Sequence, residues 1–215
     1  MSLFTAVEMA PRDPILGLNE QFAADTNPNK VNLGVGVYFD DNGKLPLLDC
    51  VQSAEKAMMD KPTARGYLPI DGIAAYDAAV KSLVFGAGSE PVTSGRVATV
   101  QGIGGTGGLK IGADFLKKIS PNAKVMISDP SWENHRALFT NAGFQVDSYA
   151  YYDAEKRGVN FEGMLASLNA AAAGNIVVLH ACCHNPTGYD ITAAQWDQVI
   201  AMVKAKSLTP FLDMA

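Results

Sequence analysis

The stretch KVMISDPSWENHRALFTNAGFQVDSYAYY, from Lys124 to Tyr152, decides the fold. Its first residues, Lys124 to Asp129, are mostly apolar and stop at a proline, which is typical of a buried strand. From Trp132 to Ala142 apolar positions recur at three- and four-residue spacing, as in a helix, and Val146 to Tyr152 predicts a second strand. A strand, a helix and a strand in this order predict a βαβ unit.

The same alternation continues on both sides of this unit. Further strands are predicted at Val97–Gln101, Ile176–Cys183 and Pro210–Asp213, and further helices at Leu109–Lys118, Phe161–Ala173 and Ala193–Lys206. Elements of these lengths in this order predict an α/β fold with a mostly parallel sheet and helices on both of its faces.

The N-terminal part lacks this rhythm. We expect an arm over Met1–Arg12, a helix that starts at Asp13-Pro14 and runs through Gln21, a strand or extended segment at Val31–Tyr38, and helices at Cys50–Met59 and Ile73–Phe85 with a loop at Gly66–Pro69.

Composition restricts the function classes. The chain has 215 residues, 48% of them hydrophobic and 18% charged, as in a soluble globular protein. Its 22 acids and 17 bases are spread along the sequence, so we expect no nucleic-acid or membrane partner. Met1–Arg12 lacks the layout of a signal peptide, and the three cysteines are too few for a disulfide framework. These features predict a cytoplasmic protein.

In parallel sheets ligands bind where the strands end, so the residues after each predicted strand are candidate site residues. The first set, GIGGTGG from Gly102 to Gly108, is predicted to be a loop between a strand and a helix, where free backbone N–H groups bind phosphate. A flexible turn is the simpler alternative. The glycines also match G-x-G-x-x-G, and Asp129 follows at the distance expected of a nicotinamide dinucleotide site.

Two further sets follow the next strands. Trp132 offers an aromatic face on which a flat ring can stack, with His135 three residues on, although both residue types are more often structural. In HNPTG, Asn185 precedes a proline and has an amide free to donate a hydrogen bond. Zinc binding by His180, Cys182, Cys183 and His184 is a poor alternative, since neighbouring residues of a strand point to opposite faces. We therefore predict no metal site.

The last candidate is Asp213 in TPFLDMA, at the exit of an apolar strand. A buried carboxylate needs a positive partner, and a protonated ring nitrogen would be one, whereas a helix N-cap is the structural alternative. A phosphate cradle, an aromatic face, an amide donor and a carboxylate at one sheet edge together suit pyridoxal phosphate. A dinucleotide would use only the first of these features.

Eight blocks carry a resemblance that extends along the whole chain. They are DPILGL (13–18), VNLGVGVY (31–38), YLPIDG (67–72), GGTGGLKIGADFL (104–116), DPSWENH (129–135), YAYYDA (149–154), LHACCHNPTG (179–188) and FLDMA (211–215). In these blocks the chain resembles the N-terminal half of class I pyridoxal-phosphate-dependent aminotransferases of the aspartate and aromatic amino acid group. YLPIDG, RVATVQ and PFLDMA are most similar to the bacterial aromatic (tyrosine) branch.

The resemblance implies a role for each candidate residue. It implies that the cofactor phosphate is held by Gly104, Gly105 and Thr106, although Gly104 stands where some relatives have serine. It also implies that Trp132 stacks on the cofactor ring, Asn185 hydrogen-bonds the ring oxygen, Asp213 keeps the ring nitrogen protonated and His135 supports Asp213.

The resemblance also implies substrate contacts and an assembly. Gly36 is expected to lie against the substrate carboxylate, near Trp132 and Asn185, and Tyr67 to reach the phosphate of a neighbouring subunit in a homodimer. The implied domains are an arm at 1–12, part of a small domain at 13–46 and a truncated large pyridoxal-phosphate-binding domain at 47–215.

Family members are about twice as long as this chain, and the resemblance places the cofactor-binding lysine outside it. No lysine here sits in a matching motif, and Lys110 is expected to face solvent or a neighbouring acid. We expect transfer of an amino group between an aromatic or acidic amino acid and 2-oxoglutarate, with little activity from residues 1–215 alone. A nicotinamide-dependent oxidoreductase and a non-catalytic truncated product are the alternatives.

Overall fold

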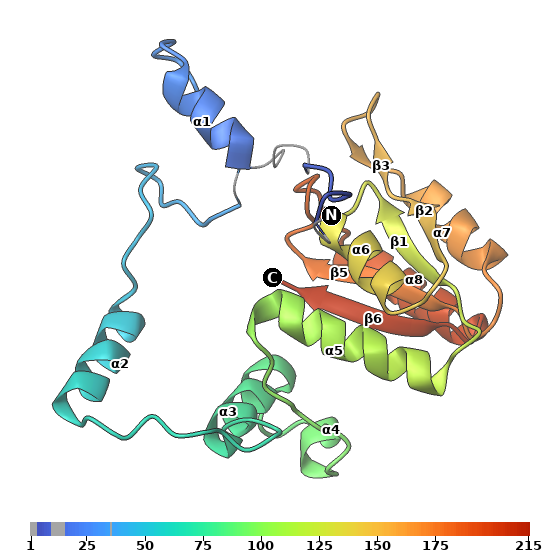
Figure 1. The fold of residues 1–215 in the computed structure, drawn as a ribbon. Helices are drawn as coiled ribbons and strands as arrows, with labels where there is room; N and C mark the ends of the chain where they lie inside the picture. The colour runs from blue at the N-terminus through green and yellow to red at the C-terminus, as the bar shows by residue number, and fades with distance from the viewer. Residues whose placement is uncertain (1–3, 10–15, 35) are drawn as a thin grey trace. The chain divides into compact units, whose positions relative to one another are not determined.

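The computed structural model describes residues 4–9, 16–34 and 36–215. The chain divides into two compact units, which we call unit 1 (Met1–Gly66) and unit 2 (Tyr67–Ala215) (Figure 1). This division rests on compactness, and the predicted domain boundaries at residues 12 and 46 stay predictions.

Unit 2 is built on a parallel sheet. Its strand order is β2-β1-β5-β6, with bounds Val146–Ala150, Val125–Asp129, Ile176–Cys182 and Thr209–Met214, and every pair is parallel. The α/β fold predicted from the sequence is confirmed, including four of its strands. All four strands end at the same edge of the sheet, where the candidate site residues were expected.

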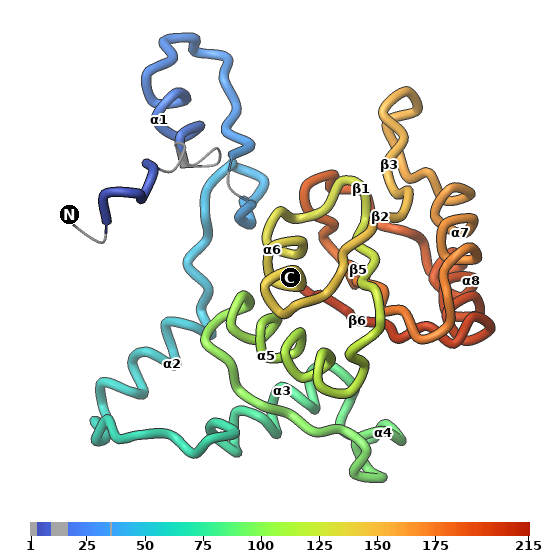
Figure 2. Tube along the Cα trace, turned by 45° about the vertical axis from the view of Figure 1, so that its right-hand side comes forward, coloured from blue at the N-terminus to red at the C-terminus, as the bar shows by residue number. Residues whose placement is uncertain are grey.

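Helices cover both faces of this sheet, as predicted (Figure 2). One face carries α5 (Gly104–Ile119) and α6 (Glu133–Asn141), and the other carries α7 (Phe161–Ala170) and α8 (Ala193–Ala205). Side chains that alternate along a strand enter different cores: Ile127 packs with α5 and α6, and its neighbour Met126 packs with α7 and α8. The strands β1 and β5 have runs of consecutive apolar residues because both faces of the sheet are buried under helices.

Local signals set the ends of the helices. At α8, the Thr192 hydroxyl accepts a hydrogen bond from the Gln195 backbone N–H at 3.3 Å, and the Gln195 side chain accepts one from the Thr192 N–H at 2.8 Å. This capping box satisfies two donors that the first turn of a helix leaves free, which explains why α8 begins at Ala193.

The predicted strand at Val97–Gln101 is wrong. These residues are irregular, and Gln101 is bonded to a turn instead: its N–H donates to the Asp71 carbonyl at 2.9 Å, and its side chain accepts from the Ile73 N–H at 3.0 Å. A strand needs a neighbouring strand, and within the described residues none lies beside this segment.

The predicted glycine loop is shorter than expected, because α5 already begins at Gly104. Residues 104–108 therefore form the first turn of this helix. Gly102 has a packing role, since a Cβ atom there would lie 2.9 Å from the backbone nitrogen of Gly108. The backbone at Gly102 thus turns back against Gly108. A dinucleotide-binding motif would have a strand directly before these glycines, and residues 97–101 do not form one.

Three smaller elements of unit 2 were missed or misplaced. The predicted strand to Tyr152 ends at Ala150, and a separate hairpin pairs β3 (Tyr152–Asp153) with β4 (Gly158–Val159). A short helix, α4 (Glu90–Thr93), was not predicted, whereas α3 (Ala74–Phe85) was.

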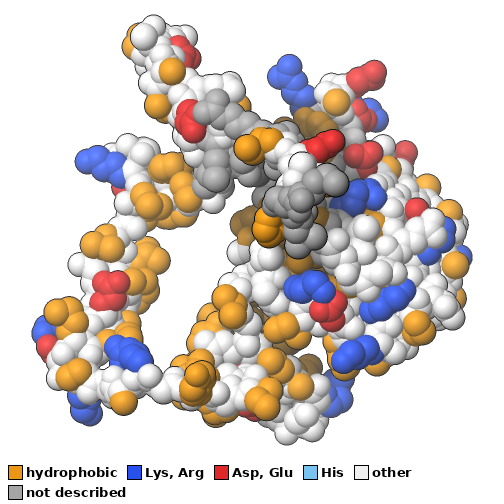
Figure 3. Space-filling model, in the orientation of Figure 1, with side chains coloured by type: hydrophobic (Ala, Val, Ile, Leu, Met, Phe, Trp, Pro, Cys, Tyr) orange, Lys and Arg blue, Asp and Glu red, His pale blue; other side chains and the backbone are white. Residues whose placement is uncertain are grey.

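Among its described residues, unit 1 has two helices, α1 (Leu16–Ala24) and α2 (Asp49–Asp60). The predicted second helix is confirmed, while the proposed start at Asp13-Pro14 and half of the predicted arm lie outside the described residues. At Val31–Tyr38 we expected a strand or an extended segment; the described residues are irregular and pair with no strand, so the strand is wrong and the extended segment stays a prediction. No apolar side chain described in unit 1 is buried, and hydrophobic side chains lie along its surface in Figure 3.

In the described part of the chain, the helices are all too short or too polar to cross a membrane.

Candidate active site

Asp213 and His135 meet at the carboxyl end of the sheet. Asp213 lies near the end of β6, and its Oδ2 is 2.8 Å from Nε2 of the fully buried His135 on α6. The other ring nitrogen, Nδ1, lies 2.9 Å from the Ser131 hydroxyl. A carboxylate only accepts and a hydroxyl can donate, so these partners favour a His135 tautomer with its hydrogen on Nε2, donated to Asp213.

This hydrogen bond controls the charge of Asp213. It lowers the pKa of Asp213, and the raising effect of partial burial does not cancel it. Asp213 is therefore ionised at neutral pH. Its Oδ1 makes no hydrogen bond to any residue that the structure describes, so it remains free to accept one from a ligand.

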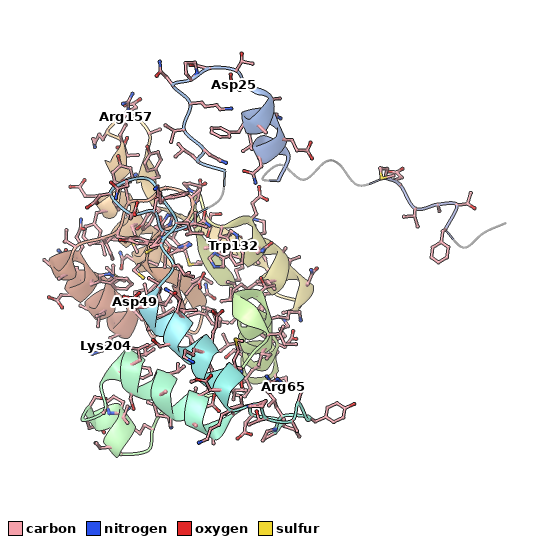
Figure 4. All side chains as sticks on the ribbon, turned by 90° about the vertical axis from the view of Figure 1, so that its left-hand side faces the viewer. Asp25, Asp49, Arg65, Trp132, Arg157 and Lys204 are labelled. Carbon is pink, nitrogen blue, oxygen red and sulfur yellow. The ribbon has the colours of Figure 1, made fainter. Side chains whose placement is uncertain are left out.

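Trp132 lies beside this pair, at the N-cap of α6 (Figure 4). Its ring is 5.4 Å from the ring of His135 at an interplanar angle of 89°, an edge contact that leaves the indole partly exposed. The predicted aromatic face and the predicted carboxylate are thus joined through one histidine.

His180 belongs to the same cluster, although its role was not predicted. It pairs with Asp213 in the register of β5 and β6, and its ring lies 5.0 Å from that of His135. Both ring nitrogens are buried, and neither has a hydrogen-bond partner among the residues that the structure describes. Burial lowers the pKa of His180 to about 4, and a smaller electrostatic effect of the neighbouring His135 acts in the same direction, so His180 is neutral at pH 7. The signal in the sequence was its position on the strand next to Asp213.

The HNPTG segment is held by a network around His184. The ring of His184 bonds the hydroxyls of Ser128 at 2.9 Å and Thr187 at 2.8 Å, and Tyr151 stacks on it at 3.9 Å. Its backbone N–H donates to Asp190 at 2.8 Å. Asn185, next in the chain, is exposed, and its amide bonds none of the described residues.

The zinc alternative is not supported by this arrangement, because both ring nitrogens of His184 already bond hydroxyls. In the part of the chain that is described, one group of side chains has the spacing of metal ligands, namely His135, His180 and Asp213, whose ligand atoms lie within 4.8 Å of one another. The hydrogen bond from His135 to Asp213 is compatible with a metal site, and it is equally compatible with a carboxylate that binds an organic cation such as a protonated ring nitrogen.

The start of α5 offers free backbone donors. The side chain of the N-cap residue, Ile103, accepts no hydrogen bond from this turn. The first backbone N–H of the helix to be bonded is that of Gly107, which donates to the Ile103 carbonyl at 3.2 Å. Gly104 has a φ of +63°, which favours glycine, and open space lies around Gly104 and Gly105. The N–H groups of Gly104 to Thr106 therefore remain for an anion, with the helix dipole behind them.

Gly36 and Tyr67 are the remaining candidates. Gly36 belongs to unit 1, whereas the cluster belongs to unit 2, and Tyr67, the first residue of unit 2, is fully exposed. Their roles stay predictions. Lys110 forms an ion pair with Asp114 one turn along α5, as expected. This ion pair argues against Lys110 as the lysine that binds the cofactor.

A family profile described as "Aminotransferase class I and II" matches residues 28–215. The chain belongs to this family. The aspartate aminotransferase of Pseudomonas aeruginosa is 63% identical to the chain over all 215 residues, and the aromatic-amino-acid aminotransferase of Escherichia coli K12 is 47% identical over 214. These aminotransferases carry both of the substrate names expected from the sequence.

Solved aminotransferases share the fold. The aromatic-amino-acid aminotransferase of Burkholderia pseudomallei, described as covalently bound to pyridoxal phosphate, is 66% identical, with a TM-score of 0.93 over 100% of this chain. The match covers 54% of that structure and 54% of the Pseudomonas aminotransferase. The chain thus spans about half the length of these aminotransferases.

Proposed function

We propose that this chain forms the cofactor-binding part of a pyridoxal-phosphate-dependent aminotransferase. The observation that carries the proposal is the ionised Asp213, which accepts a hydrogen bond from the buried His135 and keeps its second oxygen free at the carboxyl end of the sheet. Family membership supports the same function, and a nicotinamide-dependent oxidoreductase leaves this carboxylate without a role.

The residues fit the proposed cofactor at both of its ends. The unbonded N–H groups of Gly104 to Thr106 and the hydroxyl of Thr106 suit a phosphate, and a Cβ atom added at Gly104 or Gly105 would meet nothing within 4 Å. The indole of Trp132 offers a face for the pyridine ring, and the free amide of Asn185 offers a donor for the ring oxygen.

Bound pyridoxal phosphate supplies an electron sink that allows an amino group to leave one carbon atom and join another. Asp213 contributes by holding a proton on the ring nitrogen, because its negative charge stabilises the protonated form. His135 keeps this carboxylate ionised and oriented. His180, which is neutral and has no hydrogen-bond partner among the described residues, lies beside this pair without adding a positive charge.

The proposed substrates are an amino acid, aromatic or acidic, and a 2-oxo acid such as 2-oxoglutarate. We assign Gly36, Trp132 and Asn185 to the substrate side of the site. We also propose a cytoplasmic homodimer that serves amino acid biosynthesis, in which Tyr67 reaches the partner's cofactor phosphate, and domains at 1–12, 13–46 and 47–215.

Covalent attachment of the cofactor has no candidate lysine in this chain. We therefore propose that the attachment residue belongs to the part of the family's sequence that the chain does not match. Residues 1–215 alone should then show little or no amino transfer.

A joined protein tests this function. Residues 1–215 would be fused to the unmatched C-terminal part of the Pseudomonas aminotransferase and assayed for amino transfer to 2-oxoglutarate from aspartate and from tyrosine. We expect activity with at least one donor, and Asp213→Ala should lower kcat/KM by about a hundredfold or more. A folded, cofactor-loaded fusion that transfers neither amino group contradicts the proposal.

A further inference from the structure

The loop that carries Asn185 is held at its start by one carboxylate. Asp190 accepts hydrogen bonds from two successive backbone N–H groups, through Oδ2 from Cys183 and through Oδ1 from His184, both at 2.8 Å. Hydrogen bonds to a charged acceptor are stronger than those between neutral groups. Because both carboxylate oxygens are used, Asp190 fixes the direction of the backbone immediately before Asn185.

The conformation of Cys183 shows why this backbone needs such a partner. Its φ is +54°, in the left-handed region that favours glycine. The register of β5 and β6 also becomes irregular just before it, between His180 and Cys182. A residue with a side chain keeps a left-handed conformation only where its surroundings hold it. The hydrogen bond from the Cys183 N–H to Asp190 contributes this hold.

Buried side chains fasten the rest of the loop to unit 2. The ring of His184 lies between two hydroxyls, as described above, and the ring of Tyr151 stacks on it at 3.9 Å. The hydroxyl of Tyr151 donates to the Tyr189 carbonyl at 2.7 Å, next to Asp190. The loop is therefore held both before and after Asn185.

Asn185 takes no part in this network. Its side chain is exposed, and its amide bonds none of the residues that the structure describes. The direction of the amide therefore depends on the backbone that carries it. A shift of about 1 Å is enough to take a donor out of hydrogen-bond distance of its acceptor.

We propose that Asp190 is a positioning residue, which aims the Asn185 amide at the ring oxygen of the cofactor by fixing the backbone of Cys183 and His184. Asp190 does not touch the cofactor and acts through Asn185. The inference rests on the proposed role of Asn185. An amide that donates to the ring oxygen favours its ionised form and lowers its pKa, and a misdirected amide loses this effect.

A pH titration of the bound cofactor tests the proposal in the fusion with the C-terminal part of the Pseudomonas aminotransferase. The visible absorption of the cofactor changes when the ring oxygen and the nitrogen beside it lose the proton that they share. Asp190→Asn leaves one accepting oxygen in place of two, so one backbone N–H loses its partner. We expect the midpoint of the titration to rise by about one pH unit and kcat/KM to fall about tenfold.

A double-mutant cycle separates positioning from a general loss of structure. Asn185→Ala should also raise the midpoint, and adding Asp190→Asn should then change nothing further, because the amide is absent. Additive effects, or an unchanged midpoint in Asp190→Asn, overturn the proposal. An unchanged midpoint in Asn185→Ala overturns it together with the role of Asn185. A folded fusion that binds no cofactor contradicts the proposed function itself.

Asp153→Asn is the matched control. Oδ1 of Asp153 also accepts two backbone N–H groups, those of Glu155 and Lys156 at 3.0 Å each, but in the turn between β3 and β4. This substitution should leave the midpoint unchanged, and an equal rise overturns the proposal.

Tyr151→Phe provides the test if circular dichroism shows that Asp190→Asn does not fold. It removes the hydroxyl that holds the Tyr189 carbonyl and keeps the ring that stacks on His184. We expect a smaller rise of the midpoint, which Asn185→Ala again abolishes. An unchanged midpoint in this variant overturns the proposal.

Discussion

The two units differ in what their apolar side chains contact. In unit 2 the side chains of four strands and four helices form two cores, one on each face of the sheet. In unit 1, Val31 and Leu33 are 76% and 88% exposed, and α2 has no buried residue. The difference shows that hydrophobic content alone does not make a core. A core forms where strands and helices alternate and can cover one another.

The largest expected effect is on stability. Phe139 is fully buried between Phe144 and Phe211, so Phe139→Ala should lower the free energy of unfolding by about 3–5 kcal/mol. The matched change in unit 1, Phe39→Ala, removes a half-exposed ring and should cost less than about 0.5 kcal/mol. Urea unfolding followed by circular dichroism compares the two, and similar losses would remove the distinction between the units.

A glycine pair sharpens the comparison. A Cβ atom at Gly112 would lie 2.7 Å from Cε2 of Phe211, whereas one at Gly36 would meet no described atom within 4 Å. Gly112→Ala should therefore destabilise the protein by about 1–3 kcal/mol through overpacking. Gly36→Ala should be close to neutral. The midpoints of urea unfolding measure both, and a neutral Gly112→Ala would show that α5 does not pack on β6.

The pH dependence of stability should belong to unit 2, because all three histidines lie there. Burial lowers the pKa of both His180 and His184 to about 4, below the value of about 6.5 in an unfolded chain. Their contribution is complete above about pH 6.5 and is lost as the pH falls towards 4, since the unfolded state then binds more protons.

Because His180 is only partly buried, we expect a modest combined loss of about 1–2 kcal/mol. Unfolding in urea at several pH values measures it. In His180→Gln the loss should be smaller, and a pH profile unchanged by this substitution would mean that His180 does not titrate with folding.

The sequence predicted the elements of unit 2 that carry their own pattern. The apolar runs at β1 and β5 and the periodic helices α6 and α8 were found because burial on one or both faces is visible in a short window. Val97–Gln101 has the pattern of a strand but lacks a partner among the described residues, and pairing depends on residues far away in the sequence. The hairpin of β3 and β4 was missed because each of its strands has two residues.

The candidate site, like the fold, was predicted in part. Asp213, His135 and Trp132 were expected at one edge, and the structure brings these three together. His180, Ser131 and Asp190 were missed, because their partners are set by strand register and loop geometry. His180 had been considered only as a zinc ligand, although its place on the strand beside Asp213 brings it into contact with the pair.

The central claim is that Asp213 and the start of α5 hold pyridoxal phosphate, and equilibrium dialysis of residues 1–215 with this cofactor tests it most directly. We predict binding that Asp213→Asn weakens by about tenfold or more, because a charged hydrogen bond is lost. Asp197→Asn, on the exposed side of α8, should leave the Kd unchanged. Equal affinities for the wild-type chain and Asp213→Asn would contradict the claim, as would binding of NAD without binding of pyridoxal phosphate.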